Sequence, residues 1–233
     1  MNLKSLVAFG LACSMIAANQ SPVFAEEDAQ PDLAAICPGA AAWKSAHVDL
    51  LPDSMEKRDQ ARTLSQPEIR KELEERVDAD QKARKALLAR RGLPGEVAKI
   101  DDANDGWLFK MLKTHGMPAV DEVGEYGLHL TWVLVQHADR YPVMQDWALE
   151  GFRKRFEAGS FSGDDLARLS DRVLVRQGKQ QRYGTHFDWT SGKFEPKKIG
   201  DPAEVDIERA KLGLMPLSDY GCMMANAARR LGE

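Results

Sequence analysis

Apolar residues recur at helical spacing along most of this chain and predict a mainly α-helical fold. In residues 67–91, Ile69, Leu73 and Val77 fall near one face of a helix, and most other positions are charged or polar. Gly92 follows this pattern and can end the helix. We therefore expect an N-terminal helical arm that packs against the rest of the protein through a single stripe of apolar residues.

The most apolar region begins near residue 100 and predicts a compact helical core. Within it, residues 121–139 are apolar almost all round, as expected of the central helix of a core. Proline, glycine and capping residues mark where each helix starts and stops. The predicted core helices begin near residues 101, 121, 142, 162, 201 and 216.

The period of the pattern changes near residues 182–199. β-forming residues fill positions 182–189, turn-forming residues fill 190–193, and residues 194–199 can return as a second strand. We expect a short β-hairpin near residues 182–199.

Residues 1–25 have the features of a cleavable secretory signal peptide. An apolar run from Leu6 to Ala18 follows a positive charge, and cleavage is expected after Ala25. The run is too short for a membrane-spanning helix, which needs roughly 20 residues. We expect a periplasmic or secreted protein with an acidic tail and helical arm over residues 26–95 and a core domain over 96–233.

Two cysteines, Cys37 and Cys222, follow the signal peptide. An even pair in an oxidising compartment favours a disulfide. This bond would join the beginning of the domain to its end. The alternative is two unrelated buried thiols.

Charge and missing motifs exclude several functions. The formal net charge is −4 and no basic stripe is present, so nucleic acid is not expected as a partner. After the signal peptide, no apolar run approaches a membrane span. The chain lacks a His-Glu-x-x-His pair, a Cys-x-x-Cys pair, a phosphate-binding loop and a Gly-x-Ser-x-Gly elbow. No cofactor is predicted.

The most hydrophobic predicted helix ends on polar residues. Gln136 and His137 come just before its end, and Asp139 follows. His137 shares a stripe with apolar residues, so its ring should point inward. If the chain turns before Asp139, that carboxylate can orient His137 as a general base. The alternative is a core histidine that holds a helix end to a loop.

Asp171 and Arg172 lie in the middle of an apolar helix, so at least one of them should be partly buried. A buried charge needs a partner. Arg172 could bind a carboxylate or phosphate of a ligand. The alternative is an ion pair, for example between Arg172 and Asp139 or Asp105.

Gln181, Tyr183 and Thr185 alternate along the predicted strand and share one face. Their side chains form hydrogen bonds but are weak nucleophiles. They therefore fit a ligand-binding face or a buried polar ladder better than catalytic machinery.

Together these residues resemble an uncharacterised bacterial family, known only as domain of unknown function 6624, over roughly residues 100–220. The resemblance implies that the segments belong to one common design, and it implies no activity. His186 departs from the pattern, in which glutamine is more usual. The family resemblance rests on the following residues and motifs: Asn104, Trp107-Leu108, Gly116-Met117-Pro118, Gly124, Gln136-His137-Ala138-Asp139, Gln145, Asp171-Arg172-Val173, Gln181-x-Tyr183-Gly184-Thr185, Arg209, Gly213-Leu214 and Pro216-Leu217.

Two functions follow as hypotheses. In the first, a His/Asp/Arg/Tyr cluster binds a small polar or anionic ligand, or a protein partner, in the periplasm. In the second, the domain is a hydrolase or lyase with His137 as general base and Asp139 as its orienter. A metal site from His137, Asp139 and His186 is a weaker idea because these residues have no spacing signature.

Overall fold

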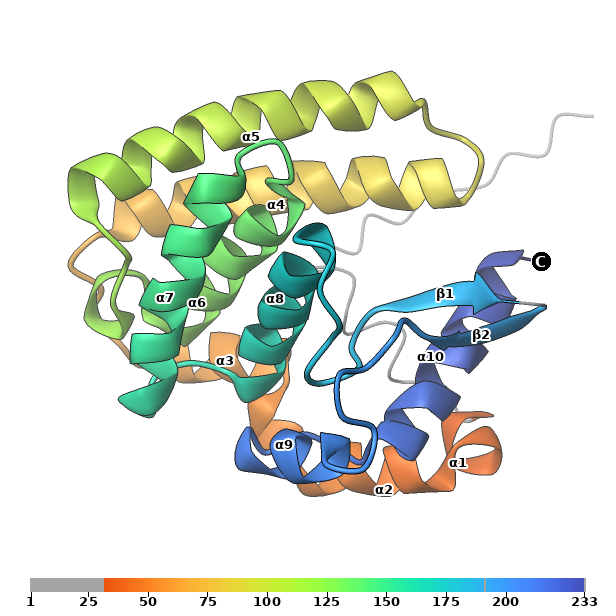
Figure 1. Ribbon diagram of the computed structural model, residues 1–233. Coiled ribbons are helices and arrows are strands. Elements are labelled where there is room, and N and C mark those ends of the chain that lie inside the picture. Colours follow the sequence, from red (N-terminus) through yellow and green to blue (C-terminus); the bar gives the residue numbers. More distant parts are fainter. Residues whose placement is uncertain (1–31, 191, 233) are drawn as a thin grey trace, which may run out of the picture.

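The computed structural model describes residues 32–190 and 192–232 (Figure 1). The predicted signal peptide over residues 1–25 lies outside this part of the chain and stays a prediction. In the part that is described, no helix is both long and apolar enough to cross a membrane. Helices dominate the fold, which confirms the predicted mainly α class.

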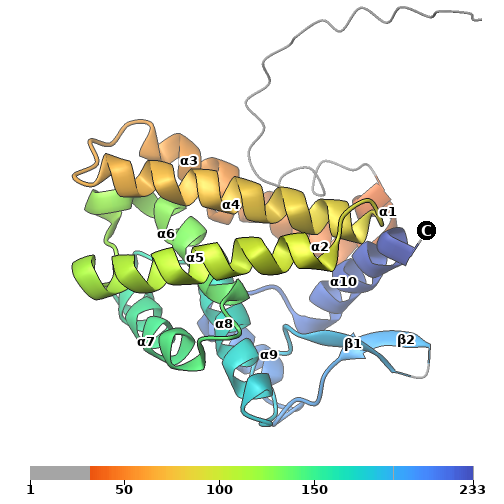
Figure 2. The same cartoon turned by 90° about the horizontal axis from the view of Figure 1, so that it is seen from above.

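Helix α6 (Val120–His137) is the centre of the core. Helices α4 (Pro67–Leu88) and α5 (Pro94–His115) cover one side of it, and α7 (Pro142–Glu157) and α8 (Gly163–Arg176) cover another (Figures 1 and 2). Because α6 is apolar nearly all round, it is stable only when other elements enclose it.

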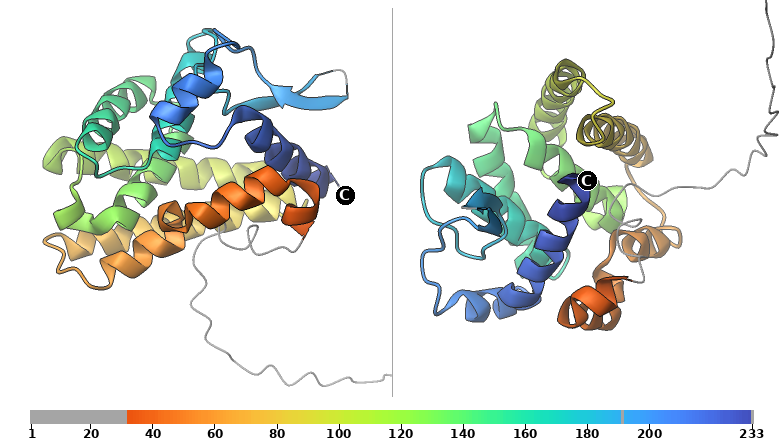
Figure 3. Two further views of the ribbon diagram at one scale, coloured as in Figure 1. Left: turned by 90° about the horizontal axis from the view of Figure 1, so that it is seen from below. Right: turned by 90° about the vertical axis from the view of Figure 1, so that its right-hand side faces the viewer.

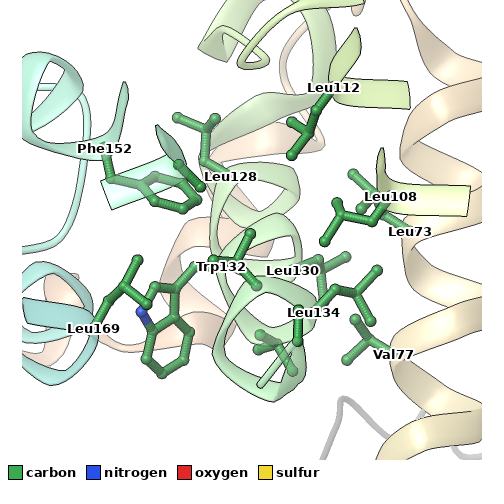
Figure 4. Packing of buried hydrophobic residues seen from close by; sticks show 14 of the residues in the cluster. Leu73, Val77, Leu108, Leu112, Leu128, Leu130, Trp132, Leu134, Phe152 and Leu169 are labelled. Atoms are coloured by element: carbon green, nitrogen blue, oxygen red, sulfur yellow. The ribbon is translucent and has the colours of Figure 1, made fainter. Parts of the chain in front are cut away.

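Figure 4 shows how the two sides of α6 are filled. Leu73 and Val77 of α4 point toward Leu130 and Leu134, whereas Leu169 of α8 lies on the side of Trp132. Helix α4, predicted as an arm, therefore packs directly into the core. Each large apolar side chain buried in this way contributes roughly 1.5–3 kcal/mol. The predicted boundary between an arm that ends at residue 95 and a core domain that begins at residue 96 stays a prediction.

A buried carboxylate from α3 (Pro52–Asp59) holds the beginning of α6. Helix α6 bends at Gly124, whose φ is 82°. Past the bend, the backbone N–H groups of Glu125 and Tyr126 donate to Asp59 at 2.8 and 2.9 Å. The guanidinium of Arg70 also contacts Asp59, at 2.7 Å. Asp59 thus satisfies helix N–H groups that the bend would leave unpaired.

The C-terminal part contains the hairpin and two helices. Strands β1 (Phe187–Thr190) and β2 (Lys193–Pro196) pair antiparallel, with Phe187 opposite Pro196. This confirms a hairpin within the predicted range, although its strands are shorter than expected. Helices α9 (Val205–Lys211) and α10 (Leu217–Gly232) follow.

The N-terminal part contains α1 (Asp32–Ile36), α2 (Pro38–Ala46) and the short 3₁₀ helix η1 (Val48–Leu50). Helices α2 and α10 lie side by side (Figure 3). The disulfide Cys37–Cys222 joins them, with 5.8 Å between the two Cα atoms, and confirms the predicted pair. It closes a loop of 185 residues, which corresponds to about 4–5 kcal/mol in the chain-entropy model.

We predict that Gly124→Ala destabilises the protein much more than Gly116→Ala. Both glycines have a φ near 80°, and alanine strains such backbone by about 1–3 kcal/mol. A Cβ at Gly124 would also meet the Asp59 carboxylate at 2.1 Å, whereas the space around Gly116 is open. Urea unfolding should show an additional loss of about 2 kcal/mol or more for Gly124→Ala. Equal losses would mean that Asp59 does not constrain the bend.

Candidate functional site

A small pocket lies between α6 and α8, near the end of α6. Its volume is about 170 Å³. Four residues from α6 and two from α8 form three pairs at positions i and i+4, one helical turn apart, so the two members of each pair face the same way. We call this the α6–α8 pocket; it is lined by Trp132, Val133, Gln136, His137, Arg168 and Arg172.

Three buried polar atoms on its wall have no hydrogen-bond partner among the described residues. They are the indole Nε1 of Trp132, a residue that is 4% exposed, the Oε1 of Gln136, which is 9% exposed, and the Nδ1 of His137. Figure 4 shows the Trp132 indole on the α8 side of α6. A buried polar group without a partner costs about 1–3 kcal/mol, so such groups are rare and need a physical explanation.

Two arginines supply the α8 side of the pocket. The Nε of Arg168 donates to Asp164 at 2.8 Å. Arg172 donates from Nε and Nη2 to the two oxygens of Asp139, at 2.8 and 2.5 Å. These bonds leave both Nη atoms of Arg168 and the Nη1 of Arg172 without a partner among the described residues. Each arginine therefore keeps N–H groups for another acceptor.

His137 lies beside a buried carboxylate, but not beside the expected one. Its Nδ1 lies 2.9 Å from Oδ2 of Asp80, which is 1% exposed. Burial alone would raise the pKa of Asp80, but His137 and Arg84 outweigh it and hold the pKa below its usual value. Asp139, the predicted orienter, pairs with Arg172 instead. The contact has the distance of an ion pair but not the geometry of a hydrogen bond, so it does not show His137 oriented as a general base.

A second carboxyl group, on α5, also has unusual surroundings. Asp105 of α5 is 2% exposed, and its Oδ2 has no partner among the described residues. Burial, together with the charges of Asp101 and Asp139, raises the pKa of Asp105 to about 6. This carboxyl therefore exchanges its proton in the physiological range.

Asp171 faces away from the pocket and organises the loop before the hairpin. Its fully buried carboxylate accepts hydrogen bonds from the backbone N–H groups of Arg182, Tyr183 and Thr185 at 2.8–3.1 Å. The hydroxyl of Thr185 donates to it as well, at 3.0 Å. Four donors thus replace the water that this charge loses on burial.

Gln181 and Tyr183 belong to the same buried loop. The amide of Gln181 donates to the carbonyls of His186 and Lys197 at 3.0 and 2.7 Å and accepts from the His186 N–H at 2.6 Å. The carbonyl of Tyr183 accepts from the buried guanidinium of Arg209 at 2.6 Å. These bonds wind residues 181–186 around Asp171, which explains why β1 begins only at residue 187.

The structure therefore divides the predicted site residues between two places. Gln136, His137 and Arg172 line the α6–α8 pocket. Asp139 does not line it but forms an ion pair with Arg172. Asp171, Gln181, Tyr183 and Thr185 form the buried loop instead. Among the described residues, no group of three or more His, Cys, Asp or Glu side chains could hold a metal ion.

Sequence reasoning missed three important residues. Trp132 and Arg168 each lie four positions before a predicted residue on the same helix, so helical spacing could have indicated both. Asp80 lies on α4, 57 positions before His137 in the printed sequence, and no spacing rule connects the two.

The comparisons with known proteins give one match. A family model described as a family of unknown function, DUF6624, matches residues 67–230. The match begins at the start of α4, so it includes the helix that the sequence resemblance did not cover. No curated protein and no solved structure matches the chain.

We predict that the neighbouring substitutions Asp171→Ala and Arg172→Ala have very different effects on stability. Asp171→Ala leaves three backbone N–H groups and one hydroxyl unpaired and should cost about 3 kcal/mol or more. Arg172→Ala breaks an exposed pair and should cost about 0–1 kcal/mol. Urea midpoints measure both. Similar losses for the two variants would contradict this separation of roles.

We also predict that Asp105→Asn changes how stability depends on pH. The folded-state pKa of about 6 exceeds the unfolded value of about 3.9, so the folded chain holds the extra proton between these values. The contribution of Asp105 to stability therefore falls as pH rises through this window, by on the order of 2–3 kcal/mol. Asp105→Asn should be stabilising near neutral pH and neutral below about pH 4. Urea unfolding of wild type and Asp105→Asn between about pH 4 and 7 tests this prediction. The exposed Asp102→Asn is the control. A difference in unfolding free energy between wild type and Asp105→Asn that does not change with pH would contradict the prediction.

Proposed function

Because the chain belongs to the DUF6624 family, for which no activity is established, we propose its function from geometry: the domain binds a small anionic ligand in the α6–α8 pocket. The observation that carries this proposal is the buried, unpartnered Trp132 Nε1 on the pocket wall. A buried N–H group without a protein partner requires an acceptor from elsewhere.

The donors around the pocket support an acceptor-rich ligand. Trp132 offers one N–H group, and Arg168 and Arg172 offer further N–H groups from two directions. Converging donors of this kind, two of them charged, suit a carboxylate or phosphate oxygen. Gln136 supplies an amide that can accept from a hydroxyl or amino group of the same ligand.

The size of the pocket supports a small metabolite. One water needs roughly 10–15 Å³ of such volume, so about 170 Å³ holds on the order of ten non-hydrogen atoms. The apolar wall from Val133 and the Trp132 ring would cover the carbon skeleton.

We assign a supporting role to the buried loop. Asp171 lies on α8 next to Arg172, and the hydrogen bonds of Gln181 and Thr185 fix the loop that covers this part of the helix. This loop would hold α8 in place against α6 without contact to the ligand. Tyr183 would act in the same way, through its carbonyl contact with Arg209.

The expected place of action is the periplasm or the extracellular space. The Cys37–Cys222 disulfide favours an oxidising compartment. The features of residues 1–25 in the sequence point the same way.

We predict that Trp132→Phe weakens anion binding by about tenfold or more, because a hydrogen bond to a charged group contributes about 1.5–3 kcal/mol. Isothermal titration with succinate and with inorganic phosphate measures the affinity. Trp147→Phe is the matched control, since Trp147 is half-exposed on α7 and does not line the pocket. Unchanged affinity in Trp132→Phe would rule out this pocket as the binding site.

A further inference from the structure

We infer that the ligand of the α6–α8 pocket is a carboxylate, and that Asp139 is an internal substitute which the ligand displaces from Arg172. This inference rests on the proposed function, and it names both the ligand class and a residue that sets affinity. Asp139 does not line the pocket, but the arginine that it holds does.

The bonds between Asp139 and Arg172 show what the arginine recognises. Nε and Nη2 of Arg172 meet the two Asp139 oxygens at 2.8 and 2.5 Å, in the parallel two-bond arrangement of a planar carboxylate. A ligand carboxylate can reproduce both bonds. The exchange puts one planar carboxylate group in the place of another at Arg172.

Each basic side chain at the pocket lies beside its own carboxylate, and these carboxylates differ in how firmly they are held. Asp80, beside His137, is buried and is also bonded by Gln81 and Arg84. Asp164 lies one turn from Arg168 on the same helix. Both are fixed by the elements that carry them.

Asp139 is the exception. It lies on the short turn between α6 and α7, and its side chain is 57% exposed. Within the part of the chain that the structure describes, its side chain accepts one hydrogen bond apart from those of Arg172, from Gln145 at 3.2 Å. An ion pair with this exposure is worth about 0–1 kcal/mol, so a ligand needs little free energy to displace it.

The displaced carboxylate would remain ionised. Burial alone would raise its pKa, but its bonds to Arg172 and Gln145 outweigh that and hold the pKa below its usual value. In water it would still be charged near neutral pH. Displacement therefore exchanges one solvated carboxylate for another and needs no proton.

The test compares wild type, Asp139→Asn, Asp139→Ala and Asp146→Asn in titrations with acetate, succinate and inorganic phosphate. Asp146 of α7 pairs with Arg176 of α8, so this pair is another aspartate–arginine contact to the same helix as Arg172, and it lies outside the pocket lining. We expect acetate and succinate to bind both Asp139 variants up to about fivefold more tightly than wild type, which is the effect of removing a competitor worth up to about 1 kcal/mol. Asp146→Asn should bind as wild type does.

Each other result overturns a defined part of the inference. If the Asp139 variants bind carboxylates no better than wild type, Asp139 positions Arg172 and does not compete. If phosphate binds wild type as tightly as acetate and succinate do, the ligand class is wrong. In both cases anion binding by wild type, weakened by Trp132→Phe, still supports the proposed function. Binding of no anion by wild type and by both Asp139 variants removes the proposed function itself.

Discussion

The complete enclosure of α6 is the constraint on which the rest of this structure depends. A helix that is apolar almost all round has no face that tolerates water, so other elements must cover it on every side. Helices α4 and α5 cover it on one side and α7 and α8 on another. The polar residues near its end cannot face solvent freely, and Gln136 and His137 are therefore held at the edge of the core, where the pocket forms.

Buried charges in this fold show why the unpaired groups of the pocket are informative. The carboxylates of Asp59, Asp80 and Asp171 each accept several hydrogen bonds or ion pairs, and the guanidinium of Arg209 is bonded to two carbonyls. Protein groups satisfy these four buried charges. The indole of Trp132 is one of several buried polar groups that have no hydrogen-bond partner among the described residues, and it differs from Asp105 in that it lines an open pocket, where a ligand could supply the acceptor.

Local patterns in the sequence predicted the elements well, because local chemistry decides them. One core helix is predicted to begin near residue 162, and α8 does begin at Gly163, where the Ser162 hydroxyl accepts from the N–H of Asp165. The hairpin and the pairing of Cys37 with Cys222 were also correct. The ion pair between Arg172 and Asp139 was one of the alternatives that the residues left open.

Contacts between distant segments could not be predicted in the same way. The alternation of Gln181, Tyr183 and Thr185 suggested a strand face, but Asp171 draws the backbone of these residues into a buried loop. The approach of Asp80 to His137 depends on how α4 packs along α6. Periodicity shows which face of a helix is buried, but it does not show which residue of another helix lies opposite.

The most direct test of the central claim is the ¹H–¹⁵N resonance of the Trp132 indole during titration with a small carboxylate such as succinate. The structure predicts a saturable shift of this resonance toward that of a hydrogen-bonded indole, while the resonance of the exposed Trp147 indole does not move. A Trp132 resonance that stays in place across a panel of small carboxylates and phosphate would contradict the assignment of this pocket as an anion-binding site.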